Sequence, residues 1–172
     1  MKGDRLRNRD RYLEEAMLFR DTDLIKVITG VRRCGKSSLL DLIRMAIESE
    51  GVAGRGFVSV NLESKGTGIK TEDQLYDYVR GRLSDKGRTY VFIDEPQRID
   101  GWQDAVNAMR VDFDCDIYLT GSNAYLLSSE LATYLSGRYV EVKMLPLSFS
   151  EFADFCGIEF VSGTSVALTP EG

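Results

Sequence analysis

A glycine-framed stretch at residues 30–37 has the spacing that phosphate chemistry needs. It reads Gly-Val-Arg-Arg-Cys-Gly-Lys-Ser, with Lys36 and Ser37 directly after the second glycine. Glycine adopts backbone angles that side chains forbid, so successive N–H groups can turn inward around an anion. A lysine ammonium can then reach the β- and γ-phosphates of a nucleotide, and a serine hydroxyl can ligate Mg²⁺. The stretch predicts a P-loop whose cofactor-binding residues are Gly30, Val31, Arg32, Arg33, Cys34, Gly35, Lys36, Ser37 and Ser38.

The segments on either side of this stretch fit a strand and a helix. Residues 24–28 form a β-rich apolar run. After the loop, apolar residues recur as one face of a helix, at Leu39, Leu40, Leu42, Ile43, Ala46 and Ile47. The order strand, loop, helix is the context that makes a P-loop pattern specific, and the helix adds its positive dipole end to the phosphate site.

A second chemical signal is the pair of acids that ends residues 89–95. Four consecutive apolar residues precede Asp94 and Glu95, which predicts a strand buried on both faces, as in a parallel sheet. Ligands in open α/β sheets lie beyond the carboxyl ends of strands. Asp94 could hold Mg²⁺ there, and Glu95 could accept a proton from an attacking water. The plain alternative is a strand that ends in a charged turn.

Three further segments extend the pattern. Residues 115–120 predict another strand, followed by Ser122 and Asn123, which could touch the γ-phosphate or simply cap a helix. A helix over 126–135 and a strand over 139–142 come next, with Arg138 between them. Residues 146–151 contain a capping box that opens a last helix.

Composition limits the classes of function. The chain has 172 residues, a net charge of −5, no histidine and three cysteines without a CxxC spacing. The lack of histidine excludes histidine-based triads and histidine-ligated metal sites. The acidic balance argues weakly against nucleic-acid binding by this segment, although a local basic patch could still exist, and no apolar run reaches membrane-spanning length. Cys115 and Cys156 are predicted as small buried residues, typical of a reducing cytoplasm. The charged residues 1–11 are predicted to be a solvated arm rather than a nucleic-acid arm.

Four separated stretches together resemble the prokaryotic AAA-like ATPases of the AAA_14 family. They are GVRRCGKSS, VFIDEPQ, LTGSNAYLLSSELATYLSGRY and MLPLSFSEF. The resemblance implies an α/β, three-layer P-loop NTPase fold of the ASCE/AAA-like type with a mainly parallel central sheet. It implies hydrolysis of ATP to ADP with Mg²⁺, with Ser37 and Asp94 at the metal. The catalytic candidates it gives are Glu95, Lys36, Asn123 and Arg138, the arginine acting within its own site, on a neighbouring subunit, or only in a structural salt bridge.

We expect an ATPase domain over residues 1–155 and the start of a lid or following region over 156–172, apparently truncated. A homo-oligomer is a possible assembly. The alternative functions are a non-hydrolysing nucleotide switch and a small-molecule kinase, although no arginine-rich lid stands out for the latter. A GTPase is disfavoured because no N-K-x-D motif occurs.

Overall fold

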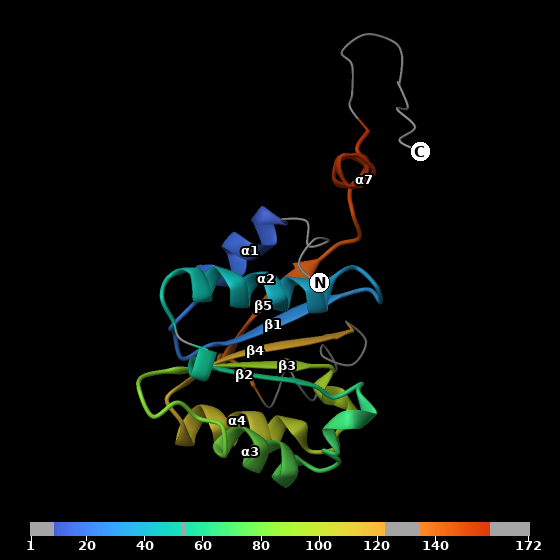
Figure 1. Cartoon of the computed structure of the whole chain (residues 1–172). Helices are drawn as coiled ribbons and strands as arrows, with labels where there is room; N and C mark the ends of the chain where they lie inside the picture. Colours follow the sequence, from blue (N-terminus) through green and yellow to red (C-terminus); the bar gives the residue numbers. More distant parts are fainter. Residues whose placement is uncertain (1–8, 53, 123–134, 159–172) are drawn as a thin grey trace.

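Five parallel strands form the centre of the computed structural model, which describes residues 9–52, 54–122 and 135–158 (Figure 1). The strands lie in the order β2-β3-β4-β1-β5 and every neighbouring pair is parallel. Their bounds are Ile25–Gly30 for β1, Phe57–Asn61 for β2, Thr89–Asp94 for β3, Cys115–Ser122 for β4 and Tyr139–Met144 for β5. All five carboxyl ends therefore point to one edge of the sheet.

Helices cover both faces of this sheet, which gives the expected three layers. Helices α1 (Asp10–Met17) and α2 (Lys36–Ser49) pack on one face. Helices α3 (Glu72–Arg80) and α4 (Trp102–Asp112) pack on the other, and α7 (Phe149–Cys156) projects away from the sheet in Figure 1. Short 3₁₀ turns complete the described elements, at Gly54–Gly56 (η2), Lys65–Thr67 (η3) and Pro96–Arg98 (η4).

Alternating side chains of the strands fill two separate hydrophobic cores. In β3, Val91 and Ile93 join the core beneath α3 and α4, whereas Tyr90 and Phe92 join the core beneath α1 and α2. Every residue of β1 and β3 is buried, because helices cover the sheet on both sides. The continuous apolar runs in the sequence have this cause.

The structure confirms the predicted α/β class and also corrects two expectations. Cys115 is buried as predicted, but Cys156 at the end of α7 is exposed. Arg9, predicted to belong to a solvated arm, has a side chain that is only 9% exposed. The helix predicted over 126–135 falls almost wholly outside the described residues. In the part of the chain that is described, no helix has the length and apolar character needed to cross a membrane.

A buried ion pair lies near the amino-terminal ends of the strands. Lys26 of β1 and Asp116 of β4 are both fully buried, and the ammonium donates a hydrogen bond to the carboxylate. Asp116 also accepts hydrogen bonds from the Tyr118 hydroxyl at 3.0 Å and from the Asp21 amide at 2.9 Å. Burial lowers the pKa of Lys26, whereas the charge of Asp116 opposes that shift. Each charge therefore depends on the other for its compensation in the core.

We predict that Lys26→Met destabilises the fold strongly, since it leaves the Asp116 carboxylate buried without its cation. Breaking one side of a buried pair costs about 3–5 kcal/mol of unfolding free energy. The measurement is urea unfolding followed by circular dichroism. Glu48→Gln, which breaks the exposed Arg44–Glu48 pair on α2, is the matched control and should cost about 0.5 kcal/mol or less. Equal midpoints for Lys26→Met and the wild-type protein would contradict the prediction.

Candidate functional site

The loop between β1 and α2 forms a tight cradle at the carboxyl edge of the sheet. Gly35 caps α2 with a φ of 97°, in the left-handed region that favours glycine. A Cβ atom on Gly30 would lie 2.6 Å from the carbonyl oxygen of Met144 and 2.7 Å from the sulfur of Cys34. Position 30 thus requires glycine because Met144 of β5 and Cys34 of the loop lie so close to it. Position 35 requires glycine for its backbone angle.

Lys36 spans the inside of this cradle. Its side chain is 6% exposed, and its ammonium donates to the carbonyl oxygens of Gly30 at 3.2 Å and Val31 at 3.1 Å. Lys36 also lines the cavity at this edge of the sheet, although its side chain is almost wholly buried. A buried ammonium with only two carbonyl partners is well suited to attract an anion.

The carboxylate of Asp94 gathers donors from three elements. Oδ2 accepts hydrogen bonds from Ser37 Oγ at 2.8 Å and from Asn61 Nδ2 at 2.9 Å, and Oδ1 accepts one from the Thr120 hydroxyl. Asn61, Asp94 and Thr120 are register partners across β2, β3 and β4. Parallel pairing therefore brings three polar strand ends into one row.

Oxygen ligands suited to Mg²⁺ meet where Ser37 touches Asp94. A hydroxyl and a carboxylate are hard donors, and Mg²⁺ usually takes one or two protein ligands together with phosphate and water oxygens. Among the described residues no group of three or more His, Cys, Asp or Glu side chains could hold a metal. Ser37 and Asp94 could hold a magnesium ion whose other ligands come from outside the protein.

Glu95 follows directly in an unusual backbone conformation. Its φ of 60° and ψ of 51° are left-handed, although it carries a side chain. Its amide donates to Thr120 Oγ1 at 3.3 Å, and its carboxylate accepts a hydrogen bond from Gln97. Strained non-glycine residues of this kind concentrate at functional sites.

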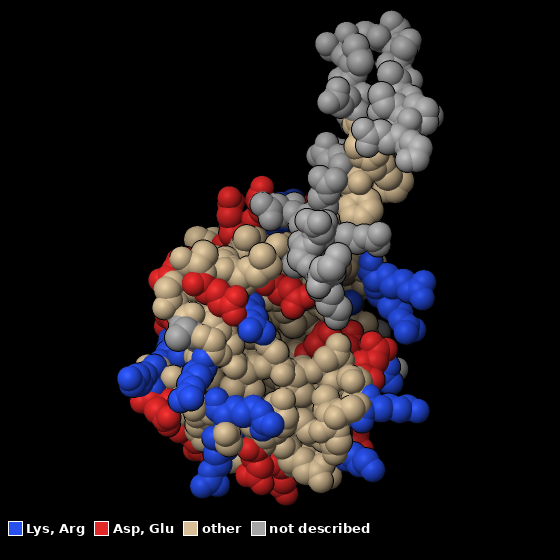
Figure 2. Space-filling model, viewed as in Figure 1, with Lys and Arg blue, Asp and Glu red and all other residues tan. Residues whose placement is uncertain are grey.

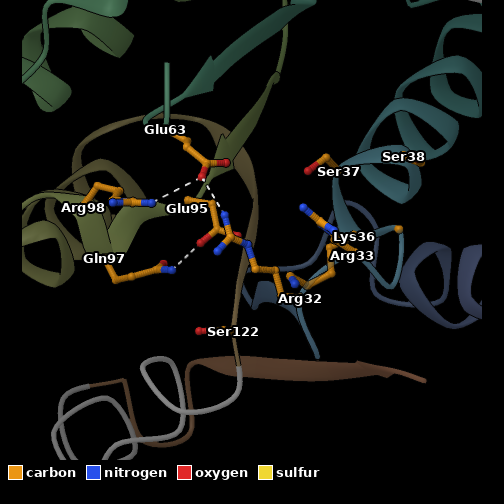
Figure 3. Close-up of a pocket in the computed structure, with 11 residues that line it drawn as sticks. Arg32, Arg33, Lys36, Ser37, Ser38, Glu63, Glu95, Gln97, Arg98 and Ser122 are labelled. Carbon is orange, nitrogen blue, oxygen red and sulfur yellow. Dashed lines mark hydrogen bonds and ion pairs between the residues drawn. The ribbon is translucent and has the colours of Figure 1, made fainter. Parts of the chain in front are cut away.

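A cavity of about 780 Å³ joins these groups. In Figure 3, Lys36 and Ser37 lie on one side, and Glu95 and Gln97 lie on the opposite side. The Glu63 carboxylate bridges the two sides through ion pairs with Arg98 at 3.3 Å and with Arg32 at 3.7 Å. The remaining described lining residues are Arg33, Gly35, Ser38 and Ser122. The volume is in the range of ligand pockets.

Several predicted residues lie elsewhere in the structure. Val31 is exposed and contributes its carbonyl to Lys36, while the side chain of Cys34 is buried in the core beneath α1 and α2. Asn123 lies outside the described residues, and its neighbour Ser122 lines the cavity. The cavity therefore unites Lys36, Ser37 and Glu95 beside Asp94, whereas the Cys34 side chain lies in the core.

Arg138 lies at the opposite edge of the sheet. The next residue, Tyr139, pairs with Ile25 at the start of β1, whereas the P-loop follows Gly30 at the end of β1. Six residue intervals along the strands correspond to about 20 Å, which exceeds the reach of a side chain. Arg138 instead donates to Asn107 Oδ1 of α4 at 3.2 Å. This geometry places Arg138 far from the cavity of its own chain.

Sequence reasoning missed Asn61 and Thr120 as partners of Asp94, and Glu63, Gln97 and Arg98 as lining residues. The first two carry a signal that could have been used: each is a polar residue at the end of an apolar run. The other three come from turns, where the sequence shows no such pattern. On the face shown in Figure 2, positive and negative side chains are interspersed rather than gathered into one basic patch.

Comparison with curated proteins finds relatives of unknown role. An uncharacterized protein of Haemophilus influenzae is 48% identical over 147 residues, which are 84% of this chain and 37% of the relative. An uncharacterized protein of Methanocaldococcus jannaschii is 36% identical over 132 residues, or 76% of this chain and 28% of the relative. The chain thus spans about a third of the length of these relatives.

Solved structures with the same fold include two from Thermotoga maritima. A DNA polymerase III gamma subunit-related protein superposes with a TM-score of 0.57 at 14% identity, covering 84% of this chain and 48% of the other. RuvB superposes with a TM-score of 0.53 at 17% identity, covering 85% and 46%. At such identities the likeness concerns the fold alone. A family model described as an AAA domain matches residues 22–153, a segment that contains the cradle, the Asp94 row and the cavity, and the chain therefore belongs to the AAA_14 family of P-loop domains.

Proposed function

We propose that this AAA domain binds ATP together with Mg²⁺ and hydrolyses it to ADP and phosphate. The observation that carries the proposal is the meeting of four side chains at one sheet edge. Lys36 and Ser37 come from the P-loop, and Asp94 and Glu95 come from the end of β3. The position matches the place where ligands bind in open α/β sheets, beyond the carboxyl ends of the strands.

The phosphates would replace partners that the P-loop now supplies to itself. The Lys36 ammonium would leave the carbonyls of Gly30 and Val31 and pair with the β- and γ-phosphates. The Ser37 hydroxyl would turn from Asp94 toward the metal site. Bound Mg²⁺ would neutralise charge on the β- and γ-phosphate oxygens.

Glu95 is the group that would take the proton. Water oxygen attacks the γ-phosphorus, its proton passes to the carboxylate, and the bond to the β-phosphate oxygen breaks with ADP as the leaving group. For this step, the carboxylate must exchange its hydrogen bond with Gln97 for one with the water.

The second candidate is a nucleotide-dependent switch that binds ATP without hydrolysing it. The contact between Gln97 and Glu95 favours it, because it occupies an oxygen of the carboxylate that the proposed step uses as its base. Turnover by the purified wild-type domain separates the two functions. Tight ATP binding with no release of phosphate would select the switch.

Lys36→Ala should weaken ATP binding by at least about tenfold, since it removes charge-assisted hydrogen bonds to the phosphates. Isothermal titration with ATP and Mg²⁺ measures the affinity. Lys70→Ala, which removes an exposed lysine outside the cavity, should bind like the wild-type protein. Unchanged affinity in Lys36→Ala would remove the P-loop from the proposal.

Glu95→Gln should retain ATP and lose turnover by about two to four orders of magnitude, because an amide keeps the size of the side chain but cannot accept the proton. Phosphate release is compared with titration on the same preparation. Asp73→Asn, a change of the same kind on exposed α3, serves as the control. If Glu95→Gln turned over ATP at the parent rate, the base would have to be another group.

We further propose that Arg138 acts on the nucleotide of a neighbouring copy. An arginine at a transferring phosphate contributes about three to five orders of magnitude in rate. The alternative is a structural role, which its hydrogen bond with Asn107 supports.

Mixing Arg138→Ala with Glu95→Gln tests this role. Each variant lacks one half of a shared site, so mixed assemblies should recover turnover that neither shows alone. A mixture of Lys36→Ala with Glu95→Gln should recover no turnover, since both substitutions damage the nucleotide-binding half of the shared site. Normal turnover by Arg138→Ala would leave only the structural role. Absence of recovery, where native mass spectrometry detects mixed assemblies, would also reject the role between copies.

A further inference from the structure

The guanidinium of Arg9 is built into the outer side of the P-loop. Arg9 precedes both α1 and the segment that the AAA family model matches. Its side chain is 9% exposed and stacks over the ring of Tyr12, 4.5 Å from the ring centroid. One terminal nitrogen, Nη1, donates to the carbonyl oxygen of Cys34 at 3.1 Å and to that of Leu145 at 2.9 Å. Arg9 is therefore a buried cation with specific hydrogen-bond partners and not part of a solvated arm.

The contact with Cys34 bears on phosphate binding through the geometry of one peptide unit. In a planar trans peptide, the C=O of one residue and the N–H of the next point in opposite directions. Holding the Cys34 carbonyl toward Arg9 therefore turns the Gly35 N–H to the other side. Gly35 lines the cavity, and its backbone is free to rotate because it carries no side chain. The contact with Arg9 thus sets the orientation of the Gly35 N–H.

The other edge of the guanidinium faces α7. Nε and Nη2 donate to the two carboxylate oxygens of Glu151 at 3.0 and 3.2 Å, a bidentate geometry. Glu151 also accepts a hydrogen bond from the Ser148 amide at 2.7 Å, and Ser148 Oγ accepts one from the Glu151 amide. The Ser148 amide, with Arg9, holds the pKa of Glu151 below its usual range. The carboxylate that caps α7 is therefore the same one that fixes Arg9.

We propose that Arg9 is a positioning residue for phosphate binding and that Glu151 holds it in this role, so that nucleotide affinity and the attachment of α7 are coupled. The inference rests on the proposed nucleotide site. It adds a residue from outside the matched segment and a connection from the P-loop to α7. Coupling of this kind is reciprocal: if α7 holds the P-loop ready, then bound nucleotide holds α7 in place.

Titration with ADP and Mg²⁺ tests the positioning role, because ADP carries the β-phosphate and is not turned over. Arg9→Gln should weaken ADP binding by about tenfold or more, since it removes a charged donor from the Cys34 carbonyl. Arg9→Lys keeps the charge and should recover part of the loss. Arg11→Gln is the matched control: it removes an exposed arginine two residues away whose guanidinium lies farther from Tyr12, 5.8 Å from the ring centroid. This variant should bind like the wild-type protein.

Glu151→Gln tests the connection to α7. It should weaken ADP binding less than Arg9→Gln does, and the double variant should bind like Arg9→Gln alone, because Glu151 acts through Arg9. Hydrogen exchange supplies a readout that a purely structural role would not move. ADP should slow exchange of the α7 amides in the wild-type protein and leave it unchanged in Arg9→Gln.

Three results would overturn the inference. The first is an ADP affinity of Arg9→Gln equal to that of the wild-type protein. The second is a double variant whose loss of ADP affinity equals the sum of the two single losses. The third is hydrogen exchange of the α7 amides that ADP does not slow in the wild-type protein. If Arg9→Gln does not fold, Glu151→Gln with the exchange measurement decides. A wild-type domain that binds neither ADP nor ATP would instead reject the proposed function.

Discussion

The carboxylate of Asp94 holds the site together. A buried acid must find donors, and Asp94 finds them on β2, on β4 and at the start of α2. The same Thr120 hydroxyl that donates to Asp94 also accepts the amide of Glu95, so the backbone of the second acid is set by the partners of the first. Thr120 is the fully buried member of this set, and without its hydroxyl both Asp94 Oδ1 and the Glu95 amide would lose the partner that they have here. The spacing between Ser37 and Glu95 is therefore a property of the whole sheet edge.

The P-loop depends on a second support, which comes from the end of β5. Met144 lies against Gly30 so closely that a Cβ would collide with its carbonyl, and the next carbonyl, that of Leu145, accepts from Arg9. Tyr12 contributes its ring to Arg9 and its hydroxyl to the amide of Leu145 at 3.2 Å. The cradle is thus fixed from behind by chain segments that precede and follow it by a long way.

The parts that sequence could predict are those whose cause is local. The glycine spacing at 30–37 can be recognised because the loop needs glycine backbone angles at fixed positions. The apolar run before Asp94 can be recognised because burial on both faces of a strand requires consecutive apolar residues. Arg9 could not be found in this way, since a charge run resembles solvent-exposed sequence until its acceptors on Cys34 and Glu151 are known. The row of Asn61 and Thr120 beside Asp94 depends on strand order and register, which periodicity does not encode. The position of Arg138 also depends on strand pairing. The pairing of β5 with β1 places it at the amino-terminal ends of the strands.

The strand order also has a consequence for the growing polypeptide. β2 and β3 are sheet neighbours and follow one another in the chain, so they can pair soon after both leave the ribosome. β1 is made first but lies between β4 and β5, the last two strands of the described chain. Until β4 and β5 are synthesised, neither edge of β1 has a strand partner, and the P-loop lacks its contact with Met144. Long-range pairing of this kind is slow and exposes strand edges. The P-loop is thus encoded early but completed late, after β4 and β5 have been synthesised.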